Sequence, residues 1–175
     1  MTAFNVTEFK SALVDGGLRP NQFQVQLAFP PLINAGQARG PERSTFLVSV
    51  AEIPGQTINP AIVQYRGREV KFAGDRTFAP YTMTVLNDTT MSIRVAMEAW
   101  MTGMEDLKGK EGLLRPRDYQ SDVTISQLNR NGDTIRVYKL REAFPVDLSP
   151  IALDFGANDQ ISTFQVTMQY QYFEI

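Results

Sequence analysis

The fold is decided by residues 68–101, REVKFAGDRTFAPYTMTVLNDTTMSIRVAMEAWM, where the spacing of the apolar side chains changes. Apolar and polar residues alternate over 70–72 and again over 81–85, which is the pattern of half-buried strands. Gly74 and Asp75 interrupt this pattern and are typical of a turn. The first half of the stretch therefore predicts two strands joined by a turn.

The second half of the same stretch predicts the main helix of the chain, over residues 88–103. Asp88 or Thr89 can accept hydrogen bonds from the unpaired N–H groups of a first helical turn. Gly103 favours the end of the helix. Apolar side chains at spacings of three to four form one face, and we expect this face to anchor the helix through Val95, Met97, Trp100 and Met101.

Most of the remaining chain predicts further strands. Asn131-Gly132 lies between two alternating runs and is the strongest short hairpin signal in the sequence. About seven strands joined mostly by turns, with one main helix, predict a mainly β fold, an antiparallel β-sandwich or barrel in a single domain over 1–175. The further strands are expected at 22–29, 45–53, within 122–140 and at 161–173.

Two segments are expected to lie outside the core. Residues 1–18 are interpreted as a short N-terminal arm. Residues 52–68 are interpreted as a long exposed loop, and long loops without regular structure usually serve a function such as contact with a partner. An ordinary surface loop is the alternative. Apolar side chains that a solvated loop would lack favour partner contact: Ile53, Ile58, Ile62, Val63 and Tyr65.

Composition excludes several classes of function. Lys plus Arg number 17 and Asp plus Glu number 19, a formal net charge of −2, so the chain lacks the basic surface of a dedicated nucleic-acid binder. The sequence has no apolar run of the roughly 20 residues that a membrane span requires and no signal-peptide pattern. We therefore expect no membrane segment, and synthesis and assembly in the cytoplasm.

Catalytic chemistry has little support in the sequence. The chain has no histidine and no cysteine, which excludes Ser–His and Cys–His pairs and leaves any metal site to carboxylates. No phosphate-binding glycine motif is present. The candidate carboxylate pairs are in turn-like settings where a structural role is expected: Glu105/Asp106, Asp154/Asp159 and Asp75/Asp88. We predict no enzyme activity, no cofactor and no metal.

The polar faces of two predicted strands carry amides where most exposed strands carry lysine and glutamate. A neutral face does not hold phosphates, so it would suit a wall along which DNA slides. A plain polar surface is the alternative. The glutamines concerned are Gln22, Gln24, Gln26, Gln165 and Gln169.

Three runs, in order along the chain, resemble the major tail tube proteins of contractile-tailed, myovirus-type bacteriophages. They are RPNQFQV at 19–25, AGDRTFAPYTMTVLND at 73–88 and NDQISTFQVTMQYQYFE at 158–174. The resemblance covers most of the chain. It implies a structural subunit that forms stacked hexameric rings around a channel for genome passage. It also implies that 52–68 protrudes between rings, and that Asp75, Arg76 and Phe78 form a turn or subunit interface.

The same resemblance implies the partners. They are other copies of the chain, the tail sheath protein, the tape-measure protein, the baseplate and tail terminator proteins, and DNA that passes without specific binding. The protein would be part of the virion. One alternative is the tube subunit of a protein-delivering contractile injection or secretion system, which neighbouring capsid and terminase genes would exclude. The other is a small β-barrel ligand-binding module, which a monomeric state and a ligand-sized pocket would favour.

Overall fold

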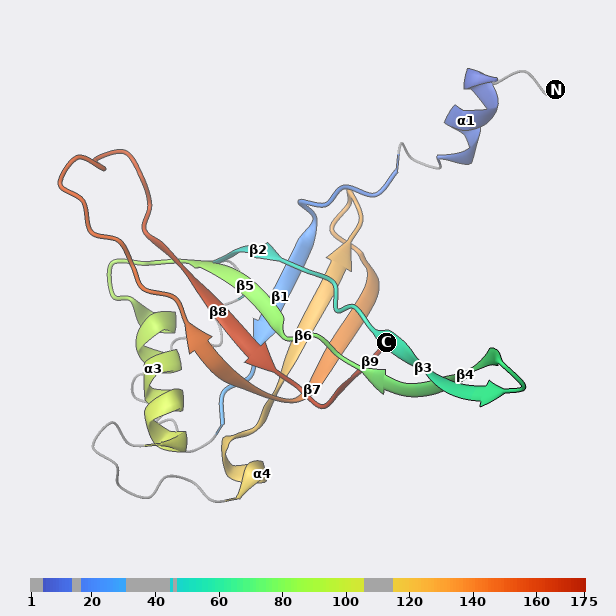
Figure 1. Ribbon diagram of the computed structural model, residues 1–175. Coiled ribbons are helices and arrows are strands. Elements are labelled where there is room, and N and C mark those ends of the chain that lie inside the picture. Colours follow the sequence, from blue (N-terminus) through green and yellow to red (C-terminus); the bar gives the residue numbers. More distant parts are fainter. Residues whose placement is uncertain (1–4, 14–16, 31–44, 46, 106–114) are drawn as a thin grey trace.

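The computed structural model describes residues 5–13, 17–30, 45, 47–105 and 115–175, and Figure 1 shows the arrangement of their helices and strands. The described residues form nine strands and one long helix, so the predicted mainly β fold is confirmed with two more strands than expected. In chain order the elements are α1 (Val6–Ala12), β1 (Phe23–Leu27), β2 (Val48–Ala51), β3 (Thr57–Tyr65), β4 (Arg68–Thr77), β5 (Tyr81–Leu86), α3 (Ser92–Met104), α4 (Pro116–Tyr119), β6 (Ser121–Leu128), β7 (Thr134–Leu148), β8 (Thr163–Gln169) and β9 (Tyr172–Glu174).

Seven strands belong to one folded sheet in the order β1-β6-β7-β8-β5-β2, with β9 added beside β7. β3 and β4 form a separate two-stranded hairpin. Neighbouring strands are antiparallel throughout these pairings. The predicted hairpin around Asn131-Gly132 is present and joins β6 to β7, with Gly132 at a φ of 87°. Its loop is held by Asn129, whose side-chain oxygen accepts the N–H groups of Asn131 and Asp133 at 2.8 Å each.

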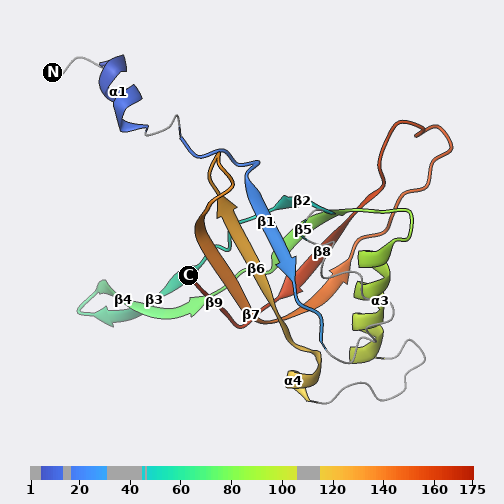
Figure 2. The ribbon, with the colours of Figure 1, turned by 180° about the vertical axis from the view of Figure 1, so that it is seen from behind.

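The long strand β7 turns the sheet into two layers. Its first part pairs with β6 and its last part pairs with β8. Between these parts Arg141 and Glu142 lie opposite the single residue Asp122, and Glu142 has a φ of 57°. Such a bulge bends a strand sharply. The layer of β1, β6 and β9 and the layer of β8, β5 and β2 therefore lie one behind the other and cross (Figures 1 and 2).

The core fills the space between these layers because each strand points alternate side chains inward. β1 contributes Val25 and Leu27, as its alternation predicts, and both are fully buried. α3 closes one side of the core. Other fully or nearly fully buried members are Met83, Val85, Ile93, Ala96, Met97, Trp100, Val123, Ile125, Leu140, Phe164, Val166 and Met168.

The main helix begins at Ser92, four residues later than expected, and extends past Gly103 to Met104. Asp88 provides the N-terminal hydrogen bonds, since its carboxylate accepts the Ser92 N–H at 2.8 Å and the Ser92 hydroxyl at 2.9 Å. Among the residues expected to anchor the helix, Met97 and Trp100 are buried, whereas Val95 and Met101 are only partly buried. Ile93 and Ala96 occupy the face that was assigned to those two residues.

The N-terminal helix α1 has every residue exposed and lies away from the body, beyond the start of β1 (Figure 1). The connections around 30–44 and 102–116 lie largely outside the described residues. Within the described part of the chain, no helix is both long enough and apolar enough to cross a membrane.

Candidate assembly surfaces

The segment 52–68 was expected to be an irregular loop, and this expectation is wrong. Most of it is strand β3, which pairs with β4 along its length. Arg66 and Gly67 form the tip with φ values of 48° and 80°, as a tight two-residue hairpin turn requires. The hairpin projects from the end of the body opposite α3 (Figure 1). The expectation of half-burial at 70–72 is also wrong, because Val70 and Phe72 are exposed.

Pairing across the hairpin separates its side chains into two faces. Ala61 pairs with Phe72, Val63 with Val70 and Tyr65 with Arg68, and paired residues lie on the same face. We call Ala61, Val63, Tyr65, Val70 and Phe72 the apolar hairpin face. The opposite face carries Ile58, Ile62, Gln64, Glu69, Lys71 and Arg76.

This apolar hairpin face is uncovered in the single chain. Val63 is 52% exposed, Tyr65 62% and Phe72 56%, and every residue of β3 is exposed. A two-stranded hairpin alone in water is marginally stable. Of the five residues predicted to contact a partner, Val63 and Tyr65 lie on this face, Ile58 and Ile62 lie on the other, and Ile53 precedes the hairpin.

The turn predicted at Gly74 to Phe78 is instead a bulge within β4. Gly74 and Asp75 lie opposite Asn59, because Ile58 pairs with Arg76 and Pro60 with Ala73. A Cβ atom on Gly74 would lie 2.5 Å from the Asn59 carbonyl oxygen, so a larger side chain does not fit without movement of the backbone. Asp75 and Arg76 are therefore strand residues.

Phe78 lies just after β4 and attaches the hairpin to the body. Its ring centroid is 5.7 Å from that of Tyr170 and 5.6 Å from that of Phe173. Phe78 is partly buried against the core of its own chain. Phe78 therefore fixes the base of the hairpin. In the sequence, the signal for this contact is the pair of aromatic residues Tyr170 and Phe173 near the end of the chain.

The predicted glutamines do not form one surface, because β1 and β8 belong to different layers. Gln24 and Gln26 lie on the outer side of the β1 layer, where Gln24 pairs with Ser126 and Gln26 with Thr124. Thr124 pairs in turn with Lys139 on β7. Gln165 and Gln169 lie on β8, in the opposite layer (Figure 2). Gln22 precedes β1, and its carbonyl accepts the Gln127 side-chain amide at 2.7 Å.

The outer side of the β8 layer carries a row of mostly uncharged polar side chains. Thr84 pairs with Gln165 and Thr82 with Thr167, so these four share a face that alternates with the buried residues of β5 and β8. Asp147 on β7 pairs with Thr167. We call Thr82, Thr84, Asp147, Gln165 and Thr167 the threonine face.

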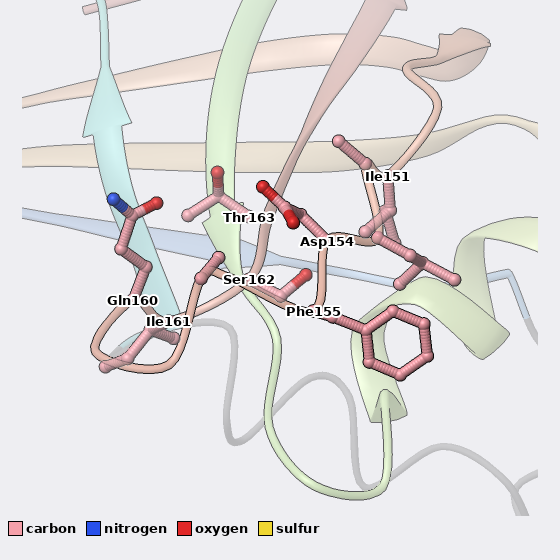
Figure 3. A pocket seen from close by; sticks show the side chains of 10 residues that line it. Ile151, Asp154, Phe155, Gln160, Ile161, Ser162 and Thr163 are labelled. Atoms are coloured by element: carbon pink, nitrogen blue, oxygen red, sulfur yellow. The ribbon is translucent and has the colours of Figure 1, made fainter.

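The loop between β7 and β8, residues 149–162, forms a further apolar surface (Figure 3). Leu153 is 93% exposed and Phe155 is fully exposed. With Ile151, Asp154 and Ile161 they line an open hollow of about 570 Å³, which we call the loop hollow. The Asp154 carboxylate accepts the Gly156 N–H at 2.8 Å, which holds the loop in a tight turn.

Charged groups meet at the corner of β7. The Arg141 guanidinium donates to the Glu174 carboxylate at 3.0 and 2.7 Å and also to the Asp122 carboxylate. These hydrogen bonds, to Glu174 first and then to Asp122, raise the pKa of Arg141 above its ordinary value. The contacts tie β9, near the end of the chain, to the bend between the layers.

No group of three or more carboxylates among the described residues could hold a metal ion. Asp75 and Asp88 lie at opposite sides of the molecule, on β4 and before α3 (Figure 1).

The Tyr81 hydroxyl is buried without a hydrogen-bond partner in the described part of the chain. Burial, and secondarily the charge of Glu52, raise the pKa of Tyr81, so its hydroxyl stays protonated in alkali where an exposed tyrosine ionises.

A two-layer β body with an uncovered hairpin, an outer face free of cations and an exposed apolar loop is typical of a structural subunit. The chain belongs to the phage tail tube protein family, whose model matches residues 18–175. This membership confirms the resemblance found in the sequence. Tail tube protein gp19 of Enterobacteria phage T4 is 28% identical over 162 residues, which cover 89% of this chain and 90% of that protein.

Solved structures share the fold at low sequence identity. A chain of the anti-feeding prophage baseplate has a TM-score of 0.62 at 15% identity, with 88% of this chain and 91% of that chain covered. A chain of the sheath-tube complex of an extracellular contractile injection system, PVC, has a TM-score of 0.59 at 14% identity. That match covers 94% of this chain and 95% of the PVC chain.

Proposed function

We propose that this protein is the subunit of a tail tube made of stacked hexameric rings, with a central channel through which the phage genome passes during ejection. The observation that carries the proposal is the uncovered apolar hairpin face in a chain of the tail tube family. A monomeric protein rarely exposes a continuous apolar surface of this kind without a partner for it. Stacked copies of the same chain supply that partner.

The hairpin makes the contact between rings in this proposal. Full burial of a side chain such as Val63 or Phe72 contributes about 1.5–3 kcal/mol relative to full exposure, and about half of each is still exposed in the single chain. Several such side chains together offset the loss of freedom when the hairpin is held by a neighbour. Stacking on a preformed ring is therefore favoured over association of free subunits.

The threonine face lines the channel in this proposal. A wall for DNA should not bind phosphate tightly, and Lys or Arg on the wall would do so. The threonine face carries no cation and one acid, Asp147, whereas the outer face of β1 and β6 continues to Lys139 on β7. Gln165 therefore stays a candidate for the channel, while Gln24 and Gln26 face the outside of the tube.

This assignment of the two faces is testable in intact tubes. The chain has no cysteine, so Gln24→Cys and Gln165→Cys each introduce a single thiol. A large maleimide reagent that cannot enter the tube should label the thiol at position 24 rapidly and leave the one at position 165 unlabelled until the tube is dissociated. Rapid labelling at position 165 in intact tubes would reverse the assignment.

The partners follow from the same architecture. A sheath protein would surround the outer face, a tape-measure protein would fill the channel before DNA, and baseplate and terminator proteins would bind the two ends. Assembly would take place in the host cytoplasm, and the chain would have no catalytic role.

A tube for a protein-delivering injection system is the second candidate function, favoured by the shared fold of the anti-feeding prophage and PVC chains. Neighbouring capsid and terminase genes would decide for a phage.

The deciding experiment shortens the hairpin. Replacement of residues 57–77 by a tight Asn-Gly turn should leave a folded subunit by circular dichroism, but negative-stain electron microscopy should show no stacked tubes. A matched control, Gln64→Ala on the opposite face of the hairpin, should form tubes of normal length. Long tubes from the shortened chain would refute the role of the hairpin. A wild-type monomer across micromolar concentrations in analytical ultracentrifugation would refute the tube itself.

A further inference from the structure

We propose that the loop hollow between β7 and β8 receives the apolar hairpin face of a second copy of the chain. Each subunit would then carry both halves of one contact, and this inference rests on the proposed function as a tube subunit. The occupant of the hollow is thus a named segment, β3–β4, of another copy.

Apolar surface is available on both sides of this contact. The hairpin presents Val63, Tyr65 and Phe72, each more than half exposed. The loop presents Leu153, Phe155 and Ile161, which are more exposed still. The hollow of about 570 Å³ is within the range of roughly 300–1,000 Å³ for clefts that enclose ligands, so it has room for several side chains.

The charges of the two segments are complementary. Residues 57–77 contain four cations, Arg66, Arg68, Lys71 and Arg76, and two acids, Glu69 and Asp75. Residues 149–162 contain the acids Asp154 and Asp159 and no Lys or Arg. Arg68 pairs with Tyr65 and so lies on the apolar hairpin face, while Asp154 lines the hollow. Opposite charges at the rim guide association and fix its orientation.

The positions of the two segments require two copies of the chain. The hairpin and the β7–β8 loop project from opposite sides of the body in both views (Figures 1 and 2), so a hairpin does not reach the loop of its own chain. A contact between two different surfaces is head-to-tail, and repetition of such a contact gives a closed ring or an open stack. This is the symmetry that a tube needs.

A photochemical label identifies whatever occupies the hollow. Phe155→Cys adds a single thiol to a chain without cysteine, at a fully exposed position that does not contribute to the core. After labelling with benzophenone maleimide, assembly and irradiation, mass spectrometry should find the cross-link in a peptide from residues 57–77. Mixed isotope-labelled subunits should show that the link joins two copies. A cross-link to another part of the chain in well-formed tubes would overturn the inference.

A double-mutant cycle tests the same contact without a label. Arg68→Gln and Asp154→Asn should each raise the protein concentration needed for assembly by about threefold, because each removes one charge of the pair. Asn at position 154 keeps a side-chain oxygen that can accept the Gly156 N–H, so the loop turn is preserved. The double variant should be no weaker than either single variant, as coupled residues are. Lys71→Gln on the opposite face, combined with Asp154→Asn, is the matched control and should show additive effects.

The outcomes separate this inference from the proposed function. Tubes whose double variant shows only the sum of the two single effects would overturn the hairpin-to-loop contact and leave the tube function intact. A wild-type chain that forms neither rings nor tubes would overturn the proposed function and this inference with it.

Discussion

Replacement of Trp100 should be among the most destabilising changes in the main helix. Its side chain is 1% exposed, its indole N–H donates to the Tyr119 carbonyl at 2.6 Å, and its ring centroid is 5.6 Å from that of Phe29. Truncation of a buried Trp to Ala costs about 3–5 kcal/mol. For a chain of this size each kcal/mol lowers the melting temperature by about 2–4 °C, so Trp100→Ala should lower it by about 6–20 °C.

Two further variants separate the contributions to this effect. Trp100→Phe keeps much of the ring but leaves the Tyr119 carbonyl without its donor, and should cost about 1–3 kcal/mol. Met101→Ala, next to it on a partly buried position, should cost about 1 kcal/mol. Because Trp100 is the single tryptophan, unfolding in urea should be followed by far-ultraviolet circular dichroism at concentrations that prevent assembly. Equal costs for Trp100→Ala and Met101→Ala would refute the assignment of the buried helix face.

Three other changes also have expected outcomes, the first and the third of them in the same urea assay. Asp88→Ala should cost about 0.5–2 kcal/mol through loss of the helix cap, whereas Thr89→Ala should be nearly neutral; equal effects would contradict the capping role of Asp88. Gly74→Ala should disrupt the hairpin bulge beside Asn59, so hydrogen exchange should accelerate in β3 and β4 while the core stays protected; unchanged exchange there would contradict the steric argument. Tyr81→Phe removes a buried hydroxyl without a partner among the described residues and should stabilise the protein by about 1 kcal/mol. Because the raised pKa of Tyr81 gives stability that is full below about pH 10 and lost above it, Tyr81→Phe should also reduce unfolding in alkali, and an unchanged alkaline transition would count against this.

The sequence predicts the body of the fold well where strand patterns are local. The alternation in residues 22–29 identifies Val25 and Leu27 as core residues, and Asn131-Gly132 marks the β6–β7 hairpin. Both signals depend on neighbouring residues in the chain, which is why they can be read without the structure. The main helix is also evident, although its buried face is rotated toward Ile93 and Ala96.

The candidate assembly surfaces are harder to predict, for physical reasons. Val70 and Phe72 alternate with polar residues as core strands do, although both are exposed, and a strand that packs against a partner would have the same pattern as one that packs against its own chain. Gly74 is compatible with a turn and with a bulge, and the carbonyl of Asn59 that decides between them comes from another strand. The glutamines of β1 and β8 are separated by the bend at Glu142, which no local pattern reveals.

The bend in β7 also has a consequence for the order of folding. β6 and β7 are joined by a short loop, whereas β1 pairs with β6 and β5 with β8 across long stretches of sequence. Local contacts close with the smallest loss of chain entropy, so the β6–β7 hairpin should form in the transition state and the distant strands should be added later. Since β7 belongs to both layers, this one hairpin then provides the template for each. Mutations in β6–β7 should mainly slow folding, and those in β1 should mainly accelerate unfolding. Stopped-flow measurements that find the reverse would exclude this order.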